Sequence, residues 1–338
     1  EMLRSLVGSE MCIRDSYIIG VDLGGTSAKL AIATPSGELK YKWNITTDNQ
    51  EGGKYIVPSI IQSLQRSLDE HDLSEQDILG IGMGSPGAVN IDQQTVVGAY
   101  NLNWTHHQAV GRQFKEAFPN TPFFIDNDAN VAALGEQWLG AGNGADHVVT
   151  LTIGTGIGGG IVVDGQLYRG SQGMAGEVGH ITVDPDSPLD CTCGKPGCFE
   201  ALASAKGVVN LAKLMASDFE EATPFHRYLE STMNVTSFDL FEAAKKEDAF
   251  ALKVVDQVCK YIGLGVSHIA NTLNPSVIVL GGGMSLAGEF MLERVRQYYQ
   301  SFTFKEIKDS THLALAELGN DAGVIGAINL VNTEILGK

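Results

Sequence analysis

The densest group of metal-binding side chains in this chain lies in GEVGHITVDPDSPLDCTCGKPGCFEALAS, residues 176–204. Three thiols and one imidazole form the donor set of a closed, tetrahedral zinc site of the structural type. Gly194 and Gly197 stand between the thiols, where converging ligands require tight backbone turns. The candidate zinc ligands are His180, Cys191, Cys193 and Cys198.

Two other uses of these thiols stay open at this point. A disulfide between two of them would leave the third unpaired, and the sequence shows no secretory signal that would favour a disulfide framework. A redox centre is less well supported, because the Cys-x-x-Cys spacing is absent. Cys259 stands inside a long apolar segment and is expected to be a buried core residue.

Asp128 is the candidate for proton transfer. It follows the apolar run FFI, which ends at Ile125, and precedes a helical segment expected from about residue 129. A carboxylate at such a strand-to-helix junction can accept a proton from a bound hydroxyl group. The alternative is helix capping, which Asp126 or Asn127 could also perform.

Glycine-rich turns recur in the chain and suggest phosphate binding through exposed backbone N–H groups. The stretch GTGIGG, residues 154–159, matches the dinucleotide fingerprint, but a β-branched run follows it instead of a helix, so that interpretation fails. The P-loop pattern is also absent. The candidate phosphate-site residues are Asp22 (toward magnesium), Gly24, Gly25, Thr26, Lys29, Gly154, Thr155, Gly156, Gly281, Gly282 and Gly283.

The elements expected around these residues are those of an α/β protein. Residues 17–45 predict strand, glycine turn, strand, turn and strand, and the same order returns about 130 residues later. This repetition predicts a duplicated domain. Apolar spacing predicts an amphipathic helix over 54–70, a long helix over 251–275 and a last helix after Asp321.

Length and charge set further limits. A chain of 338 residues can form two domains, since single cores rarely exceed about 250–300 residues. The net charge of −17 opposes a nucleic-acid partner, and no apolar run reaches membrane-spanning length. Residues 1–16 resemble a translated adaptor sequence and are expected to be a non-native or disordered leader, so that the fold begins at Tyr17.

The ordered motifs DLGGT, NDAN, GEVGH and CTCGKPGCFE resemble the ROK family, which contains bacterial sugar kinases and related repressors. The resemblance implies a duplicated actin/hexokinase-like (ribonuclease H-like) nucleotide-binding fold, with two lobes and a cleft between them. It places a small lobe at 17–130, completed by a helix at 321–338, and a large lobe at 131–320 that carries a zinc loop at 180–198.

The resemblance also implies an activity: transfer of a phosphoryl group from ATP, with Mg²⁺, to the 6-hydroxyl of a hexose, with Asp128 as general base. The sequence blocks favour glucose, while fructose, N-acetylmannosamine or allose as acceptor and polyphosphate as donor stay open. A repressor is not expected, because no DNA-binding segment precedes Tyr17. The implied sugar contacts are Asn101, Asn127, Glu177, His180 and Glu200.

His180 would bind structural Zn²⁺ through one ring nitrogen and face the sugar with the other. The family resemblance further implies a cytoplasmic homo-oligomer, either a dimer or a tetramer, with no membrane or nucleic-acid partner.

Overall fold

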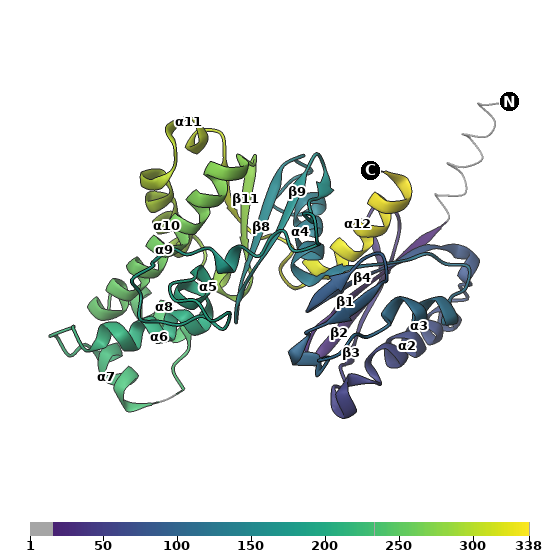
Figure 1. Cartoon of the computed structure of the whole chain (residues 1–338), viewed down its shortest axis with the longest axis horizontal. Coiled ribbons are helices and arrows are strands. Elements are labelled where there is room, and N and C mark those ends of the chain that lie inside the picture. The colour runs from purple at the N-terminus through teal and green to yellow at the C-terminus, as the bar shows by residue number, and fades with distance from the viewer. Residues whose placement is uncertain (1–15, 233, 338) are drawn as a thin grey trace. The chain divides into compact units, whose positions relative to one another are not determined.

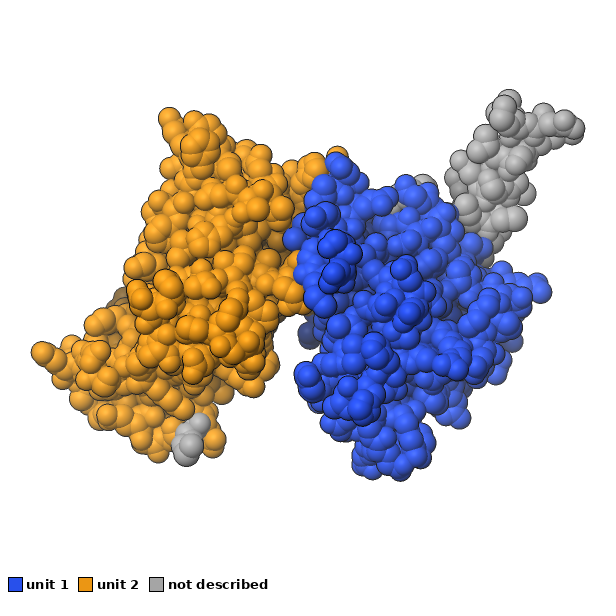
Figure 2. Space-filling model, viewed as in Figure 1, with its two compact units in different colours: residues 1–144, 160–175, 320–338 blue, residues 145–159, 176–319 orange. Residues whose placement is uncertain are grey.

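The computed structural model describes residues 16–232 and 234–337, so the predicted leader lies almost entirely outside the described residues. The described chain divides into two compact units (Figure 2). Unit 1 comprises residues 16–144, 160–175 and 320–337, and unit 2 comprises 145–159 and 176–319. Compact units need not coincide with functional lobes, so the lobe boundary expected at residue 131 stays a prediction.

Unit 1 contains a five-stranded sheet in the order β3-β2-β1-β4-β7. The first three strands form an antiparallel meander, and β4 and β7 run parallel to β1. The strands are β1 (Tyr17–Leu23), β2 (Ser27–Ala33), β3 (Leu39–Thr46), β4 (Ile78–Ser85) and β7 (Phe123–Asn127). The turns that join β1 to β2 and β2 to β3 contain glycine and lie where the sequence predicted turns.

Helices cover both faces of this sheet (Figure 1). Alternate side chains of β1 point to opposite faces: Val21 and its alternate neighbours join the core formed with α2 and α3, whereas Gly20 and Asp22 face α12. The helices are α2 (Ile56–Glu70), α3 (Val110–Ala117), α4 (Asp128–Leu139) and α12 (Ala322–Leu336). The remaining elements are η1 (Gln50–Gly53), η2 (Glu75–Asp77), β5 (Ala88–Asn90), β6 (Thr95–Val97), η3 (Tyr100–Leu102) and η6 (Gly319–Asp321).

Glycines allow α12 to lie very close to its neighbours in unit 1. A Cβ atom added to Gly82 of β4 would overlap the carbonyl of Ala327, and one added to Gly326 would overlap the carbonyl of Val131 in α4. Gly323, Gly326 and Ala327 are small residues of this last helix. Their role is to bring the backbone of α12 against both β4 and α4.

The second sheet has the order β10-β9-β8-β11-β12 and repeats the arrangement of the first. β8 is in the position of β1, β9 and β10 continue the meander, and β11 and β12 extend the sheet in parallel. The strands are β8 (Val148–Ile153), β9 (Ile157–Val163), β10 (Gln166–Leu167), β11 (Val277–Gly281) and β12 (His312–Leu315). The predicted duplication is therefore confirmed.

Unit 2 contains β8, β11, β12 and the start of β9, whereas the rest of β9 and β10 belong to unit 1. Most other elements of unit 2 are helices, and several of them pack on α9, a helix of 25 residues. The helices of unit 2 are η4 (Val178–His180), α5 (Phe199–Ala203), α6 (Ala205–Ala216), α7 (Pro224–Ser231), α8 (Ser237–Lys245), α9 (Ala249–Leu273), η5 (Gly283–Ala287), α10 (Glu289–Phe302) and α11 (Lys305–Lys308). The triple-glycine turn opens first into the 3-10 helix η5 and only then into α10. Among the described residues, no helix combines the length and apolar character needed to cross a membrane.

Candidate functional site

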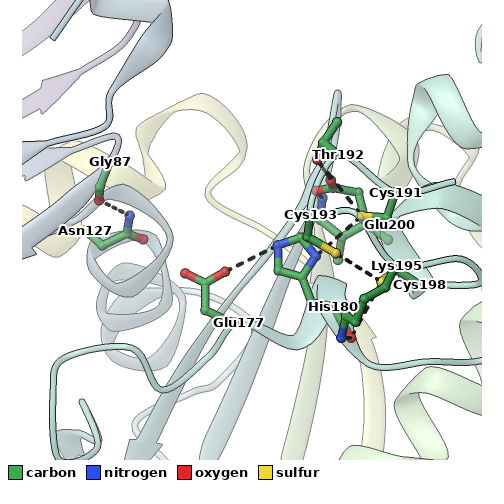
Figure 3. Close-up of polar contacts among 11 residues, drawn as sticks. Gly87, Asn127, Glu177, His180, Cys191, Thr192, Cys193, Lys195, Cys198 and Glu200 are labelled. Atoms are coloured by element: carbon green, nitrogen blue, oxygen red, sulfur yellow. Dashed lines mark hydrogen bonds and ion pairs between the residues drawn. The ribbon is translucent and has the colours of Figure 1, made fainter. Parts of the chain in front are cut away.

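Asp128 is the first residue of α4, directly after β7. The helix cap is Asn127, whose Oδ1 accepts the N–H of Ala129 at 3.0 Å, while its Nδ2 donates to the carbonyl of Gly87 at 3.2 Å (Figure 3). The capping alternative for Asp128 is thereby weakened, although its Oδ1 also accepts from Ala129 N at 2.9 Å.

The surroundings of Asp128 favour its neutral form. Burial raises the pKa of this carboxyl group, the hydrogen bond from Ala129 opposes that effect, and the negative charge of Asp22 adds to it. A carboxylate with a raised pKa is a stronger proton acceptor than an exposed aspartate. These surroundings make Asp128 more basic than an exposed aspartate, which is a property that a general base needs.

Two residues that the sequence did not assign to the site, Asp126 and Arg169, form an ion pair, and Asp126 stands two positions before Asp128. Asp126, whose side chain is only 3% exposed, accepts a hydrogen bond from Arg169 Nε at 2.6 Å. The sequence offers Asp126 only as a possible helix cap, and no motif points to Arg169. The sequence signal for this pair was a charged residue at the end of an otherwise apolar strand, which in a buried position requires a partner.

The first glycine turn joins β1 to β2. Gly24 N donates to Ser27 O at 3.0 Å, and Asn101 packs on Gly25, where an added Cβ would be 3.1 Å from its Nδ2. Asp22, at the end of β1, forms an ion pair with Lys29 at 3.0 Å. Lys29, which the sequence offered as a phosphate ligand, thus already neutralises the carboxylate expected to face magnesium.

The second glycine turn, residues 154–156, lies in unit 2. Gly154 N donates to Gly156 O at 2.9 Å, and Thr155 at the tip is exposed. Glu200, one of the implied sugar contacts, lies against this turn and accepts the N–H of Ile157 at 2.9 Å. Its other carboxylate oxygen accepts from Thr192 at 3.4 Å.

The triple glycine at 281–283 begins at the last residue of β11 and lies beside the second turn. Gly282 has a φ of 80°, and an added Cβ would be 2.5 Å from the carbonyl of Ile153, the residue before Gly154. No atom lies within 4 Å of the position of a Cβ on Gly283. Unit 2 thus brings together two of the three glycine segments predicted to bind the nucleotide.

The four candidate zinc ligands converge, with all ligand atoms within 4.8 Å of one another. His180 Nδ1 lies 3.6 Å from Cys191 Sγ, and the sulfurs of Cys193 and Cys198 are also 3.6 Å apart (Figure 3). With a zinc–sulfur distance of about 2.3 Å, the edges of a tetrahedral site are about 3.8 Å long. The donor set and its spacing therefore fit a zinc ion.

The protein backbone holds the thiols in this arrangement. Gly194 and Gly197 both have positive φ angles, and the Cβ that Gly197 lacks would overlap the carbonyl of Asp184. All three cysteines are free thiols, which leaves no support for the disulfide alternative. Burial, together with the neighbouring thiols, raises the pKa of Cys198 to about 12, whereas a hydrogen bond from the backbone of Lys195 lowers the pKa of Cys193. A bound cation would favour the ionised form of the thiols that hold it. Cys259 is fully buried in α9, as predicted.

The two ring nitrogens of His180 point in different directions. Nδ1 faces Cys191, and Nε2 lies 3.9 Å from Oε2 of Glu177, which is exposed (Figure 3). The dual use of His180 suggested by the sequence is thus geometrically available. Of the implied sugar contacts, Asn101 and Asn127 belong to unit 1, and Glu177, His180 and Glu200 belong to unit 2.

The repeated sheet order and the glycine turn that follows the first strand of each sheet define the class of actin/hexokinase-type nucleotide-binding proteins. Within that class, the chain belongs to the ROK family, whose family model matches residues 18–334.

Three known proteins illustrate the similarity. The glucokinase of Halalkalibacterium halodurans is 42% identical over 95% of this chain and 96% of its own length. A putative xylose repressor from a Caldicellulosiruptor species is 30% identical over 94% of this chain but only 79% of its own. The crystal structure of a ROK family glucokinase from Streptomyces griseus, in complex with glucose and AMPPNP, has a TM-score of 0.73 and 31% identity, and the match covers 93% of this chain and 99% of that one.

Proposed function

We propose that this protein is a glucokinase, which transfers the terminal phosphoryl group of ATP to the 6-hydroxyl of glucose. The observation that carries the proposal is the state of Asp128: a partly buried carboxylate with a raised pKa, at a helix start capped by its neighbour Asn127. The glucokinase relative at 42% identity over nearly its whole length supports glucose as the acceptor. The ATP analogue in the Streptomyces griseus glucokinase complex agrees with ATP as the donor.

In the proposed reaction Asp128 accepts the proton of the sugar 6-hydroxyl as the hydroxyl oxygen attacks the γ-phosphorus of ATP. The bond from that phosphorus to the bridging oxygen breaks, and ADP leaves. The product carboxylic acid is favoured by the same burial that raises the pKa of Asp128. Positioning of the acceptor and neutralisation of charge on the phosphoryl group supply the rest of the catalysis. Mg²⁺, when bound with ATP, would neutralise phosphate charge.

The proposed nucleotide contacts are the three glycine segments with Thr26, Thr155 and the Asp22–Lys29 pair. Exposed backbone N–H groups in such turns bind phosphate oxygens without a dedicated helix. Since Lys29 already pairs with Asp22, its contribution to phosphate binding would come through that pair and not as a free cation. Asp22 would orient the magnesium ion.

The cysteine-rich loop is proposed to bind structural Zn²⁺ through His180, Cys191, Cys193 and Cys198. The metal would fix the ring orientation of His180, so that Nε2 donates or accepts on the side of Glu177. Asn101, Asn127, Glu177, His180 and Glu200 are the proposed sugar contacts. Glu200 would bind the sugar while its carboxylate still accepts the N–H of Ile157. We also propose that the protein is a cytoplasmic homo-oligomer, either a dimer or a tetramer.

A panel of sugars tests this function. Glucose, fructose, mannose, N-acetylmannosamine and allose would each be offered with ATP and Mg²⁺, and kcat/KM would be measured by ADP release. We expect glucose to have the highest specificity constant. A higher kcat/KM for another sugar would reassign the acceptor, and no transfer to any sugar would overturn the kinase activity itself.

A further inference from the structure

Asp126 is a buried carboxylate that contacts both sides of the proposed base. Its Oδ1 accepts the backbone N–H of Asn127 at 2.8 Å and the side-chain Nδ2 of Asn130 at 2.8 Å. Asp128 lies between these two donors in the first turn of α4. One carboxylate oxygen therefore ties down the residue before the proposed base and the residue two positions after it.

Asn130 depends on this contact for its orientation. Its side chain is buried, and its Oδ1 has no hydrogen-bond partner among the described residues. The bond to Asp126 is thus the polar contact that selects its rotamer. A change in the position or charge of Asp126 would therefore alter the conformation of the first turn of α4.

The second oxygen of Asp126 accepts from Arg169 Nε at 2.6 Å. The guanidinium group also donates through Nη2 to Oε1 of Glu334 in α12 at 3.1 Å. Arg169 lies just after β10, in the segment 160–175 that belongs to unit 1. The same segment packs directly on α4, because an added Cβ on Gly160 would be 2.8 Å from the carbonyl of Ala129.

The ion pair fixes the carboxylate of Asp126 from its second oxygen. Arg169 Nε donates to Oδ2, while Oδ1 accepts from Asn127 and Asn130. A buried polar group that loses its partner is costly, so without Arg169 this carboxylate would shift toward another partner or draw in water. Arg169 thereby sets the position of the oxygen that holds Asn127 and Asn130.

We infer that Arg169 is a positioning residue for the base Asp128 and acts through the carboxylate of Asp126. This inference rests on the proposed kinase function for its kinetic test. Arg169 does not contact Asp128 itself, so its effect is on the placement of the carboxylate and not on the proton transfer directly.

The kinetic test uses Arg169→Gln and Arg169→Lys in the full-length protein. A misplacement of about 1 Å at a catalytic group can cost on the order of 100-fold in rate. We therefore expect kcat for glucose to fall by roughly 10- to 100-fold in Arg169→Gln, with KM for ATP unchanged, and Arg169→Lys to recover part of the loss. Wild-type kcat in Arg169→Gln would overturn the inference.

A double-mutant cycle separates positioning from general damage. If Arg169 acts only through Asp128, Arg169→Gln should cause no further loss of kcat in an Asp128→Asn background. An equal fractional loss in both backgrounds would overturn the inference. Lys42→Met is the matched control, since it breaks an exposed ion pair with Asp321 in the same unit and should leave kcat unchanged.

Two further measurements remain informative if a variant is unstable or the sugar is wrong. The variant Asp126→Asn/Arg169→Gln removes both charges together and avoids an unpaired buried carboxylate; it should lose kcat as Arg169→Gln does, and wild-type kcat would overturn the inference. Hydrogen exchange of the peptide spanning β7 and the start of α4 needs no activity. It should be faster in Arg169→Gln than in wild type or Lys42→Met, and unchanged exchange would overturn the inference even if the kinase proposal itself had failed.

Discussion

The Nδ1 atom of His180 lies 3.6 Å from the sulfur of Cys191, while the Nε2 atom of the same ring faces Glu177. One imidazole therefore joins the thiol cluster to a residue outside it. A metal on the Nδ1 side would determine which tautomer and which ring orientation the Nε2 side presents. Through such a metal, the cysteines would influence His180, a proposed sugar contact, without contacting the sugar themselves.

Replacing Cys193 by serine should remove both the metal and the activity. The variant loses one of four ligands, and structural zinc sites need all four for high affinity. We expect less than one zinc per chain by elemental analysis and a large loss of glucose phosphorylation, although Cys193 is an exposed residue.

Cys259→Ser provides the matched control for that experiment. Cys259 is buried in α9, far along the chain from the cysteine-rich loop. The Cys259→Ser variant should therefore retain its zinc even if its stability falls. A Cys193→Ser protein that was free of zinc and fully active would contradict the proposed role of the metal in orienting His180.

Replacing Asp128 by asparagine should lower kcat by about 100- to 10,000-fold, the usual contribution of a general base. The amide oxygen can still accept the N–H of Ala129, so the local structure is retained. Glucose affinity, measured by calorimetry, should change little. A variant with near-normal turnover would show that another group accepts the proton.

Much of the scaffold could be predicted because its signals are local. β-Rich runs separated by glycine turns indicated the two meanders, and the spacing of apolar residues indicated α2. The cysteine spacing indicated the converging ligands, since Gly194 and Gly197 provide the turns that this convergence needs. Such features depend on residues close together in the chain.

Two of the interactions that were missed join residues distant in sequence. Arg169 pairs with Asp126 across 43 positions, and Glu200 accepts from Ile157 across 43 positions as well. No periodicity or motif encodes these pairings, because they depend on how strands and helices pack. The pairing of Lys29 with Asp22 was also missed, although it follows from the β1–β2 register that places the two residues opposite each other.

The close packing of α12 on α4 predicts an unusual response at Gly326. An alanine there would normally favour the helix by about 1 kcal/mol. Its Cβ would instead overlap the backbone carbonyl of Val131, which cannot move without shifting α4. We expect a net destabilisation of about 1–3 kcal/mol in urea unfolding. Gly283→Ala, where no atom lies within 4 Å of the added methyl group, should be close to neutral; an increase in stability for Gly326→Ala would show that the two helices separate without cost.

The raised pKa of Asp128 also predicts how stability depends on pH. Because burial favours the neutral acid, the folded state binds this proton more tightly than the unfolded state, whose aspartate has the ordinary value of 3.8. The contribution of Asp128 to stability is therefore complete below that ordinary value and is lost as the pH rises through the raised, folded-state pKa. At neutral pH the ionised side chain opposes folding, so the uncharged Asp128→Asn protein should be more stable than wild type. Unfolding by urea across this pH range should show the advantage of the variant shrinking as the pH falls toward 3.8; a variant that was less stable than wild type at neutral pH would contradict the assigned direction of the pKa shift.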